Sequence, residues 1–79
     1  MPQNETIMED QEFLEKLGQR IAQLRKEKGM TQVEFAEKLG IQRTALTRIE
    51  VGNVNTTLLM VKKICSVLNI DLPTLFLFQ

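Results

Sequence analysis

The sequence predicts an all-α domain of five short helices. Apolar residues recur at intervals of three or four along most of the 79 residues, and no segment has the pattern of a strand. Glycines and residues suited to helix caps separate the apolar stretches. The chain has no histidine and one cysteine, Cys65, so neither an internal disulfide nor a typical zinc site is expected to stabilise it. Helix packing or oligomerisation must do so instead.

The first predicted helix begins near Glu12 and ends at Gly29, a residue suited to a left-handed helix cap. Four residues spaced three or four apart form its buried stripe: Leu14, Leu17, Ile21 and Leu24. The segment before it, residues 1–11, is polar and acidic and is expected to be a flexible leader. The folded domain is therefore predicted to span residues 12–79.

The start of the second helix is the best marked in the chain. Thr31 and Glu34 have the spacing of a capping box, and Met30 and Phe35 stand at the two positions of a hydrophobic staple. Gly40 closes this helix. Its packing residues are predicted to be Val33, Phe35, Ala36 and Leu39.

The third predicted helix, from about Gln42 to Glu50, has an apolar side and a polar side. At about 100° per residue, the apolar side holds Ala45, Leu46 and Ile49. The polar side holds Arg43, Thr44, Thr47 and Arg48. Two helices joined by so tight a turn form a helix-turn-helix unit, which many all-helical cores also contain.

The fourth helix is expected to start at Asn55 or Thr56. It is predicted to bury Leu58, Val61, Ile64, Cys65 and Leu68. Among these apolar neighbours Cys65 is interpreted as a small buried hydrophobe rather than a redox switch. A last short helix follows, with Asp71 as its cap and Pro73 in its first turn, and it ends in an apolar string at residues 75–78.

Charge is distributed unevenly along a chain whose net charge is zero. Residues 1–15 hold five acidic residues and no basic one, whereas residues 16–79 hold ten basic residues and five acidic ones. A basic folded part indicates a polyanionic partner, although a solvated surface would explain it equally well. No apolar run approaches the ~18–20 residues of a membrane span, so no membrane association and a cytoplasmic location are expected.

Several motifs agree in order and spacing with a known family. They are RKEKGMTQ at residues 25–32, FAEKLGI at 35–41, RIEVG at 48–52 and LNI at 68–70. Together they resemble the phage lambda repressor and Cro-type (XRE-type) helix-turn-helix domains over about residues 14–76. The resemblance implies a compact five-helix lambda repressor-like fold, with the helix-turn-helix at the second and third helices.

The resemblance also implies a role for individual residues. The third helix would be the recognition helix in the DNA major groove, with the base-contacting residues Arg43, Thr44 and Thr47. The implied phosphate-contacting residues are Gln32, Gln42, Arg48 and Asn53. Arg25 and Glu50 match a structural ion pair that joins the first helix to the end of the third.

The chemistry of Arg43 fits the implied role. An arginine pairs in bidentate fashion with the O6 and N7 atoms of guanine, and threonine methyl groups suit the methyl group of thymine. Without the resemblance, the same residues would be interpreted as a solvated polar face.

Apolar residues outside the core stripes suggest an interface between two copies of the chain. The predicted homodimer interface uses the fourth and fifth helices and the C-terminus, with Leu59, Met60, Leu77 and Phe78. Alternatively, the residues from Leu75 to Phe78 cap the core of a monomer.

These observations predict a sequence-specific, double-stranded DNA-binding regulator of transcription, in the first place a repressor, acting as a dimer on a near-palindromic operator. One alternative is a protein-binding adaptor or antitoxin whose hydrophobic C-terminal surface docks a toxin or other partner. Another is a restriction-modification controller protein, and a purely structural bundle is a third. An enzyme is the poorest interpretation, because no catalytic or metal-ligand cluster is present in the sequence. No cofactor or metal is expected.

Overall fold

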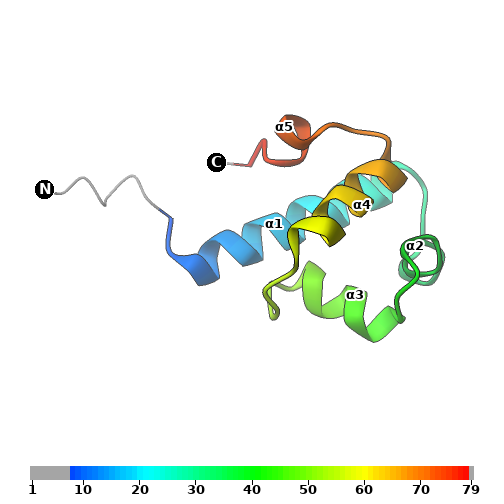
Figure 1. Ribbon diagram of the computed structural model, residues 1–79, viewed down its shortest axis with the longest axis horizontal. Coiled ribbons are helices and arrows are strands. Elements are labelled where there is room, and N and C mark those ends of the chain that lie inside the picture. Colours follow the sequence, from blue (N-terminus) through cyan, green and yellow to red (C-terminus); the bar gives the residue numbers. More distant parts are fainter. Residues whose placement is uncertain (1–7, 79) are drawn as a thin grey trace, which may run out of the picture.

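The computed structural model describes residues 8–78, and these residues form five helices. Their bounds are α1 Asp10–Glu27, α2 Gln32–Leu39, α3 Arg43–Glu50, α4 Leu58–Leu68 and α5 Leu72–Leu75. The long helix α1 packs against α3, α4 and α5, while α2 packs against α3 and α4 (Figure 1). In Figure 1, α3 and α5 lie on opposite sides of α1. The predicted all-helical fold is confirmed for the described residues.

One hydrophobic core joins all five helices. Each helix contributes to it, and Phe35 of α2 is among the largest fully buried side chains. The buried apolar residues are Leu17, Ile21, Leu24, Phe35, Ala36, Leu39, Leu46, Ile49, Val61, Ile64, Cys65, Leu68 and Leu75. Cys65 is a free, buried cysteine, and burial raises the pKa of its thiol, with a smaller contribution from the charge of Asp71.

Three residues expected in the core stripes lie at its margin or outside it. Leu14 is only half-buried, because the first turns of α1 extend past the helices that pack on it. Val33 is 52% exposed on the outer side of α2. Leu58 is 75% exposed, since α4 begins at Leu58 rather than at residue 55 or 56, and its first residue lies beyond the edge of the core.

The helix starts follow the cap residues of the sequence, with two shifts. α1 begins at Asp10, two residues before the expected start and within the expected leader, most of which lies outside the described residues. Thr57 caps α4, where its hydroxyl accepts the backbone N–H of Met60 at 3.1 Å. The caps at Thr31 and Asp71 are as predicted. Gly29 and Gly40 adopt the left-handed conformation expected of helix ends, with φ of 76° and 73°.

The capping box of α2 makes the ionisation of Glu34 sensitive to Thr31. The Thr31 backbone N–H donates to the Glu34 carboxylate at 2.8 Å, and the Glu34 N–H donates to the Thr31 hydroxyl at 3.1 Å. The hydrogen bonds from Thr31 hold the pKa of Glu34 below its ordinary value of 4.5. A carboxylate with a lowered pKa contributes stability above pH 4.5 that is lost as the pH falls through its folded-state pKa.

The Thr31→Ala variant loses the hydroxyl but keeps the backbone N–H, which lowers the pKa of Glu34 most. It is therefore expected to raise this pKa only part of the way towards 4.5 and to make stability depend less on pH on the acid side. An NMR titration of the Glu34 carboxyl resonance measures the first effect, and urea unfolding at several acidic pH values measures the second. The Asp71 carboxyl at the start of α5 is the control, because hydrogen bonds with Thr74 lower its pKa and Thr31→Ala should leave them intact. An unchanged Glu34 pKa in the variant contradicts this account of the cap.

Gly18 allows α1 and α3 to approach each other closely. A Cβ atom at this position would collide with the backbone carbonyl oxygens of Ile49 and Glu50, so the end of α3 rests directly on α1. Beside this contact, the Gln11 amide donates to the Gly52 carbonyl oxygen at 2.9 Å. The end of the helix-turn-helix is thereby fixed to the first helix.

Gly18→Ala is expected to destabilise the protein by about 1–3 kcal/mol, because the new methyl group must displace backbone atoms. The sign of this stability change is diagnostic, since replacing glycine by alanine in an open helix interior instead stabilises a protein by about 1 kcal/mol. Urea unfolding measures the difference, and Gln19→Ala at the exposed neighbouring position is the control. Stabilisation by Gly18→Ala would rule out the close approach.

Candidate nucleic-acid interface

The turn between α2 and α3 sets the position of the third helix. Gly40 turns the chain in the left-handed conformation, and the Ile41 N–H then donates to the Ala36 carbonyl oxygen at 3.0 Å. Leu46 and Ile49 of α3 point into the core, whereas Arg43 and Thr44 are exposed in its first turn. The N-terminal half of α3 thus presents polar side chains to solvent.

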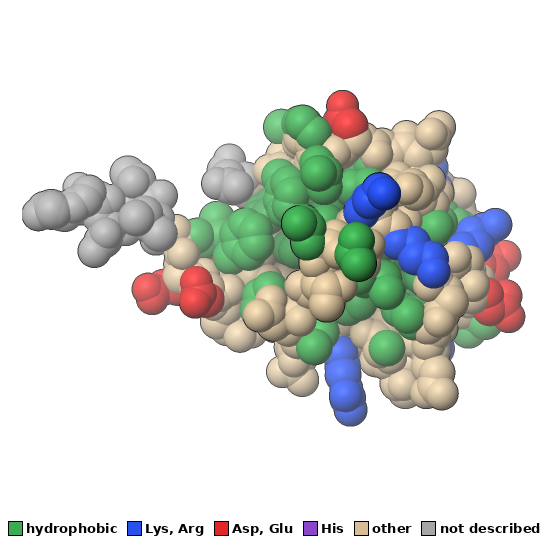
Figure 2. Space-filling view, in the orientation of Figure 1, with side chains coloured by type: hydrophobic (Ala, Val, Ile, Leu, Met, Phe, Trp, Pro, Cys, Tyr) green, Lys and Arg blue, Asp and Glu red, His purple; other side chains and the backbone are tan. Residues whose placement is uncertain are grey.

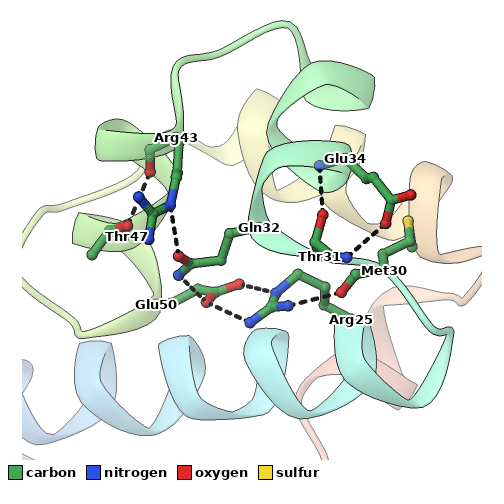
Figure 3. A network of polar contacts seen from close by, with 8 residues as sticks. All are labelled: Arg25, Met30, Thr31, Gln32, Glu34, Arg43, Thr47 and Glu50. Carbon is green, nitrogen blue, oxygen red and sulfur yellow. Dashed lines mark hydrogen bonds and ion pairs between the residues drawn. The ribbon is translucent and has the colours of Figure 1, made fainter.

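A buried ion pair fixes the other end of α3. The Arg25 Nε donates to one oxygen of the Glu50 carboxylate at 2.7 Å, and its Nη2 donates to the other oxygen at 3.2 Å. A third bond runs from Arg25 Nη1 to the Met30 carbonyl oxygen at 2.8 Å (Figure 3). Arg25 and Glu50 are only 6% and 7% exposed. The pair joins the end of α1 to the end of α3, as the sequence resemblance implies.

Gln32 connects this ion pair to Arg43. Its amide nitrogen donates to the Glu50 carboxylate at 3.0 Å, and its amide oxygen accepts from Arg43 Nε at 3.2 Å (Figure 3). Because Glu50 can only accept, the Gln32 amide must turn its oxygen towards Arg43. Within residues 8–78, no hydrogen bond involves the two terminal nitrogens of Arg43. These nitrogens remain free for an external acceptor.

Thr44 and Thr47 accompany Arg43 on the same side of α3. Thr44 is exposed and Thr47 is partly buried. The Thr47 hydroxyl donates to the Arg43 carbonyl oxygen at 3.0 Å, one helical turn back. This bond uses the hydroxyl proton and leaves the methyl group and the oxygen lone pairs available.

The expected phosphate-contacting residues differ in their surroundings. Gln42, Arg48 and Asn53 are exposed, and the Gln42 side chain makes no cap bond at the start of α3. Gln32 is partly buried and engaged with Glu50 and Arg43, an arrangement that the sequence did not predict. Its phosphate contact stays a prediction.

A model of the HTH_3 helix-turn-helix family matches residues 21–75, which include this whole arrangement. The chain belongs to this family. The resemblance found in the sequence is thereby confirmed, and the family is one of transcriptional regulators rather than enzymes.

Relatives of this HTH_3 chain share its helix-turn-helix. An uncharacterised HTH-type transcriptional regulator of Archaeoglobus fulgidus is 39% identical over 60 residues, which cover 76% of this chain and 86% of the relative. The HTH-type transcriptional regulator SinR of Bacillus subtilis is 40% identical over 60 residues, or 75% of this chain and 54% of SinR.

Solved structures of the family have the same fold. The restriction-modification controller protein C.AhdI of Aeromonas hydrophila superimposes with a TM-score of 0.76 at 35% identity, over 80% of this chain and 96% of C.AhdI. A point mutant of the restriction-modification controller protein C.Esp1396I superimposes with a TM-score of 0.74 at 33% identity, over 81% of each chain.

The expected dimer residues of this HTH_3 chain fall into two groups. Leu59 and Leu77 are 77% and 70% exposed, whereas Met60 and Phe78 are partly buried against their own core. Phe78 lies in an aromatic cluster with Phe13 and Phe76, with ring centroids 5.6 and 6.1 Å from its own. The C-terminal segment therefore covers part of the monomer core, and the sequence did not predict the contribution of Phe13.

None of the helices within residues 8–78 is long and apolar enough to cross a bilayer. In the same part of the chain, no three His, Cys, Asp or Glu residues are grouped so that they could hold a metal ion.

Proposed function

We propose that this HTH_3 protein binds double-stranded DNA sequence-specifically and represses transcription as a homodimer on a near-palindromic operator. The observation that carries the proposal is the chain of contacts from the buried Arg25–Glu50 pair through Gln32 to Arg43. These contacts hold the Nε of the exposed Arg43 at the first turn of α3. Within residues 8–78, the two terminal nitrogens of Arg43 make no hydrogen bond. A purely structural bundle has no need for such an arrangement.

The proposed base recognition follows from this geometry. With α3 in the major groove, the two terminal nitrogens of Arg43 pair with the O6 and N7 atoms of a guanine. Thr44 and Thr47 are on the same side of the helix, where their methyl groups suit a thymine. Because Gln32 restrains the Arg43 side chain in advance, less conformational entropy is lost when the guanine is bound.

Contacts to the DNA backbone would fix the register of α3. We assign them to Gln32, Gln42, Arg48 and Asn53, of which the last three are exposed. The uncapped N-terminus of α3 adds free N–H groups near Gln42. Such contacts contribute affinity and make it dependent on salt, with little information about sequence.

The proposed dimer places two recognition helices about 34 Å apart, one turn of DNA. Its interface is assigned to the start of α4 and the C-terminal segment, with Leu59, Met60, Leu77 and Phe78. The high exposure of Leu59 and Leu77 supports this assignment. A protein with this ligand works in the compartment that holds the DNA, and the cytoplasmic location stays a prediction.

Selection of bound oligonucleotides from a random pool tests the proposal directly. We expect enrichment of an inverted repeat whose half-sites are about 10 base pairs apart and contain a guanine, with binding that weakens steeply as salt rises. A pool that shows no enrichment and no salt-dependent retention of DNA would refute the proposed function. Enrichment of a single half-site would refute the dimer and keep the DNA binding.

A narrower candidate function is control of restriction-modification genes. The likeness to C.AhdI favours it, because that controller is matched over 96% of its length. The test is whether the selected operator occurs upstream of genes for a restriction endonuclease and its methyltransferase. Operators found only elsewhere in the source genome exclude this candidate.

A further inference from the structure

An apolar groove opens beside the proposed recognition helix. It lies between α3, the loop that follows α3 and the first turn of α4, and its volume is about 270 Å³. The polar residues 55–57 of the loop form one edge. The remaining lining residues are mainly apolar: Ile41, Ala45, Arg48, Ile49, Val54 and Met60.

Two exposed leucines stand next to this groove. Leu58 and Leu59 are the first residues of α4 and are 75% and 77% exposed. They lie between Thr57 and Met60, which both line the groove, yet neither leucine lines it. Figure 2 shows apolar side chains gathered on the face of the molecule that carries α4 and α5. An apolar projection and an apolar groove are therefore neighbours on one surface.

We propose that the groove of each protomer binds the Leu58–Leu59 pair of a second copy of the chain. This interface specifies the dimer contact and so rests on the proposed function, in which the protein acts as a homodimer. A two-fold axis between the leucines and the groove brings each leucine pair to the groove of the other protomer. Such a self-complementary patch is what an isologous dimer requires.

The chemistry of the groove favours a second copy over a charged partner. Among residues 8–78, Arg48 is the only charged residue in the lining, so an apolar segment fits better than an acidic or basic peptide. The occupant must also be small and aliphatic to enter a groove of about 270 Å³. The exposed leucine pair of the same chain meets both conditions.

The exposed area is sufficient for a reversible dimer. Leu58, Leu59 and Val54 are 75%, 77% and 40% exposed, and docking would cover them together with the groove walls on both protomers. An interface of so few side chains lies near the lower limit of about 1,000 Å² for a biological interface, so a dimer that dissociates on dilution is expected.

The groove and the base-facing residues lie on different sides of α3. At about 100° per residue, the groove residues Ala45 and Ile49 are centred about 150–180° away from Arg43 and Thr47. Partner leucines in the groove therefore leave the base-facing side open. Arg48 lies at the boundary, because it lines the groove and is exposed. A leucine packed on its stem would restrain the Arg48 side chain beside the DNA backbone.

Sedimentation of the full chain without DNA tests the interface. One variant, Leu58→Ser/Leu59→Ser, removes the projection, and another, Ala45→Leu, fills the groove. Each is expected to weaken self-association at least about tenfold. The control Val33→Glu changes an exposed apolar residue of α2 outside the groove and should leave self-association unchanged. Circular dichroism confirms that each variant is folded.

Mixing the two interface variants gives the most specific readout. The double-serine variant keeps an intact groove and Ala45→Leu keeps intact leucines, so the mixed dimer retains one of the two contacts. We expect the mixture to associate more strongly than either variant alone. A mixture that is no stronger than its components would overturn the proposal.

The remaining outcomes also decide the proposal. A wild-type chain that stays monomeric up to about 1 mM would overturn it and leave the groove to another occupant. A further variant, Leu77→Glu, probes the C-terminal part of the assigned interface. Dissociation by Leu77→Glu but not by the double-serine variant would place the dimer contact in the C-terminal segment alone and equally overturn the proposal. Because these measurements contain no DNA, their failure is distinguishable from a failure of DNA binding by the wild-type chain.

Discussion

Glu50→Ala is expected to lower the free energy of unfolding by about 3–5 kcal/mol, because it leaves the buried Arg25 guanidinium without its counter-ion. Arg25 is 6% exposed and would keep only its bond to the Met30 carbonyl oxygen. A domain of this size has a total stability of about 4–12 kcal/mol, so the variant loses a large share of it. Urea unfolding followed by circular dichroism measures the loss.

Two further variants separate the charge effect from general damage. Glu12→Ala, on the exposed first turn of α1, should change stability by less than about 0.5 kcal/mol. Arg25→Met/Glu50→Leu removes both charges, and its stability should return close to that of the wild-type chain. A loss below about 1 kcal/mol in Glu50→Ala would show that water reaches the pair.

The double variant also tests whether Glu50 positions Arg43. Once Glu50 is leucine, the Gln32 amide has no carboxylate to orient it, although the protein is stable. Specific DNA affinity should then fall by about 2- to 10-fold, the worth of one ordinary hydrogen bond. A purely structural ion pair would leave the affinity of the stable double variant unchanged.

The parts of the fold that could be predicted from sequence depend on residues close together in the chain. Thr31 and Glu34 are three residues apart, and their capping box forms as predicted. Gly29 and Gly40 end helices because their left-handed conformation is a local property. The start of α4 is harder to predict, since Asn55, Thr56 and Thr57 all suit a cap and the structure uses Thr57. The error in that start explains why Leu58 was expected in the core.

Other features depend on residues far apart in the chain. In the sequence, Gly18 is simply an unfavourable residue within a helix. Its role becomes clear only in the structure, where the carbonyl groups of Ile49 and Glu50 pack directly against it. The role of Gln32 depends on Glu50, 18 residues later, and on Arg43, 11 residues later. The family resemblance implied a phosphate contact for this side chain and did not predict the bridge. No periodicity in the sequence could have revealed either contact.

Arg43→Ala is expected to weaken binding to the selected operator by about 5- to 150-fold, because a bidentate arginine–guanine contact is worth about 1–3 kcal/mol. Binding to unrelated DNA should fall much less, since it loses at most one charge near the backbone. Fluorescence anisotropy with both DNAs at one salt concentration measures the two affinities. Arg43 is exposed, so the stability of the variant should stay within about 0.5 kcal/mol of the wild-type value.

Arg48→Ala is the matched control, because it removes an exposed arginine of the same helix from a proposed phosphate contact. It should weaken binding to both DNAs alike and reduce the salt dependence by about one counterion. Arg43→Lys keeps the charge and can still donate to guanine, but it has no Nε–H for Gln32 and no planar fork. It should therefore lose affinity for the operator, although less than Arg43→Ala does. Equal losses on operator and unrelated DNA in Arg43→Ala would reduce Arg43 to a phosphate contact, and the base-reading role of α3 would then fall to Thr44 and Thr47.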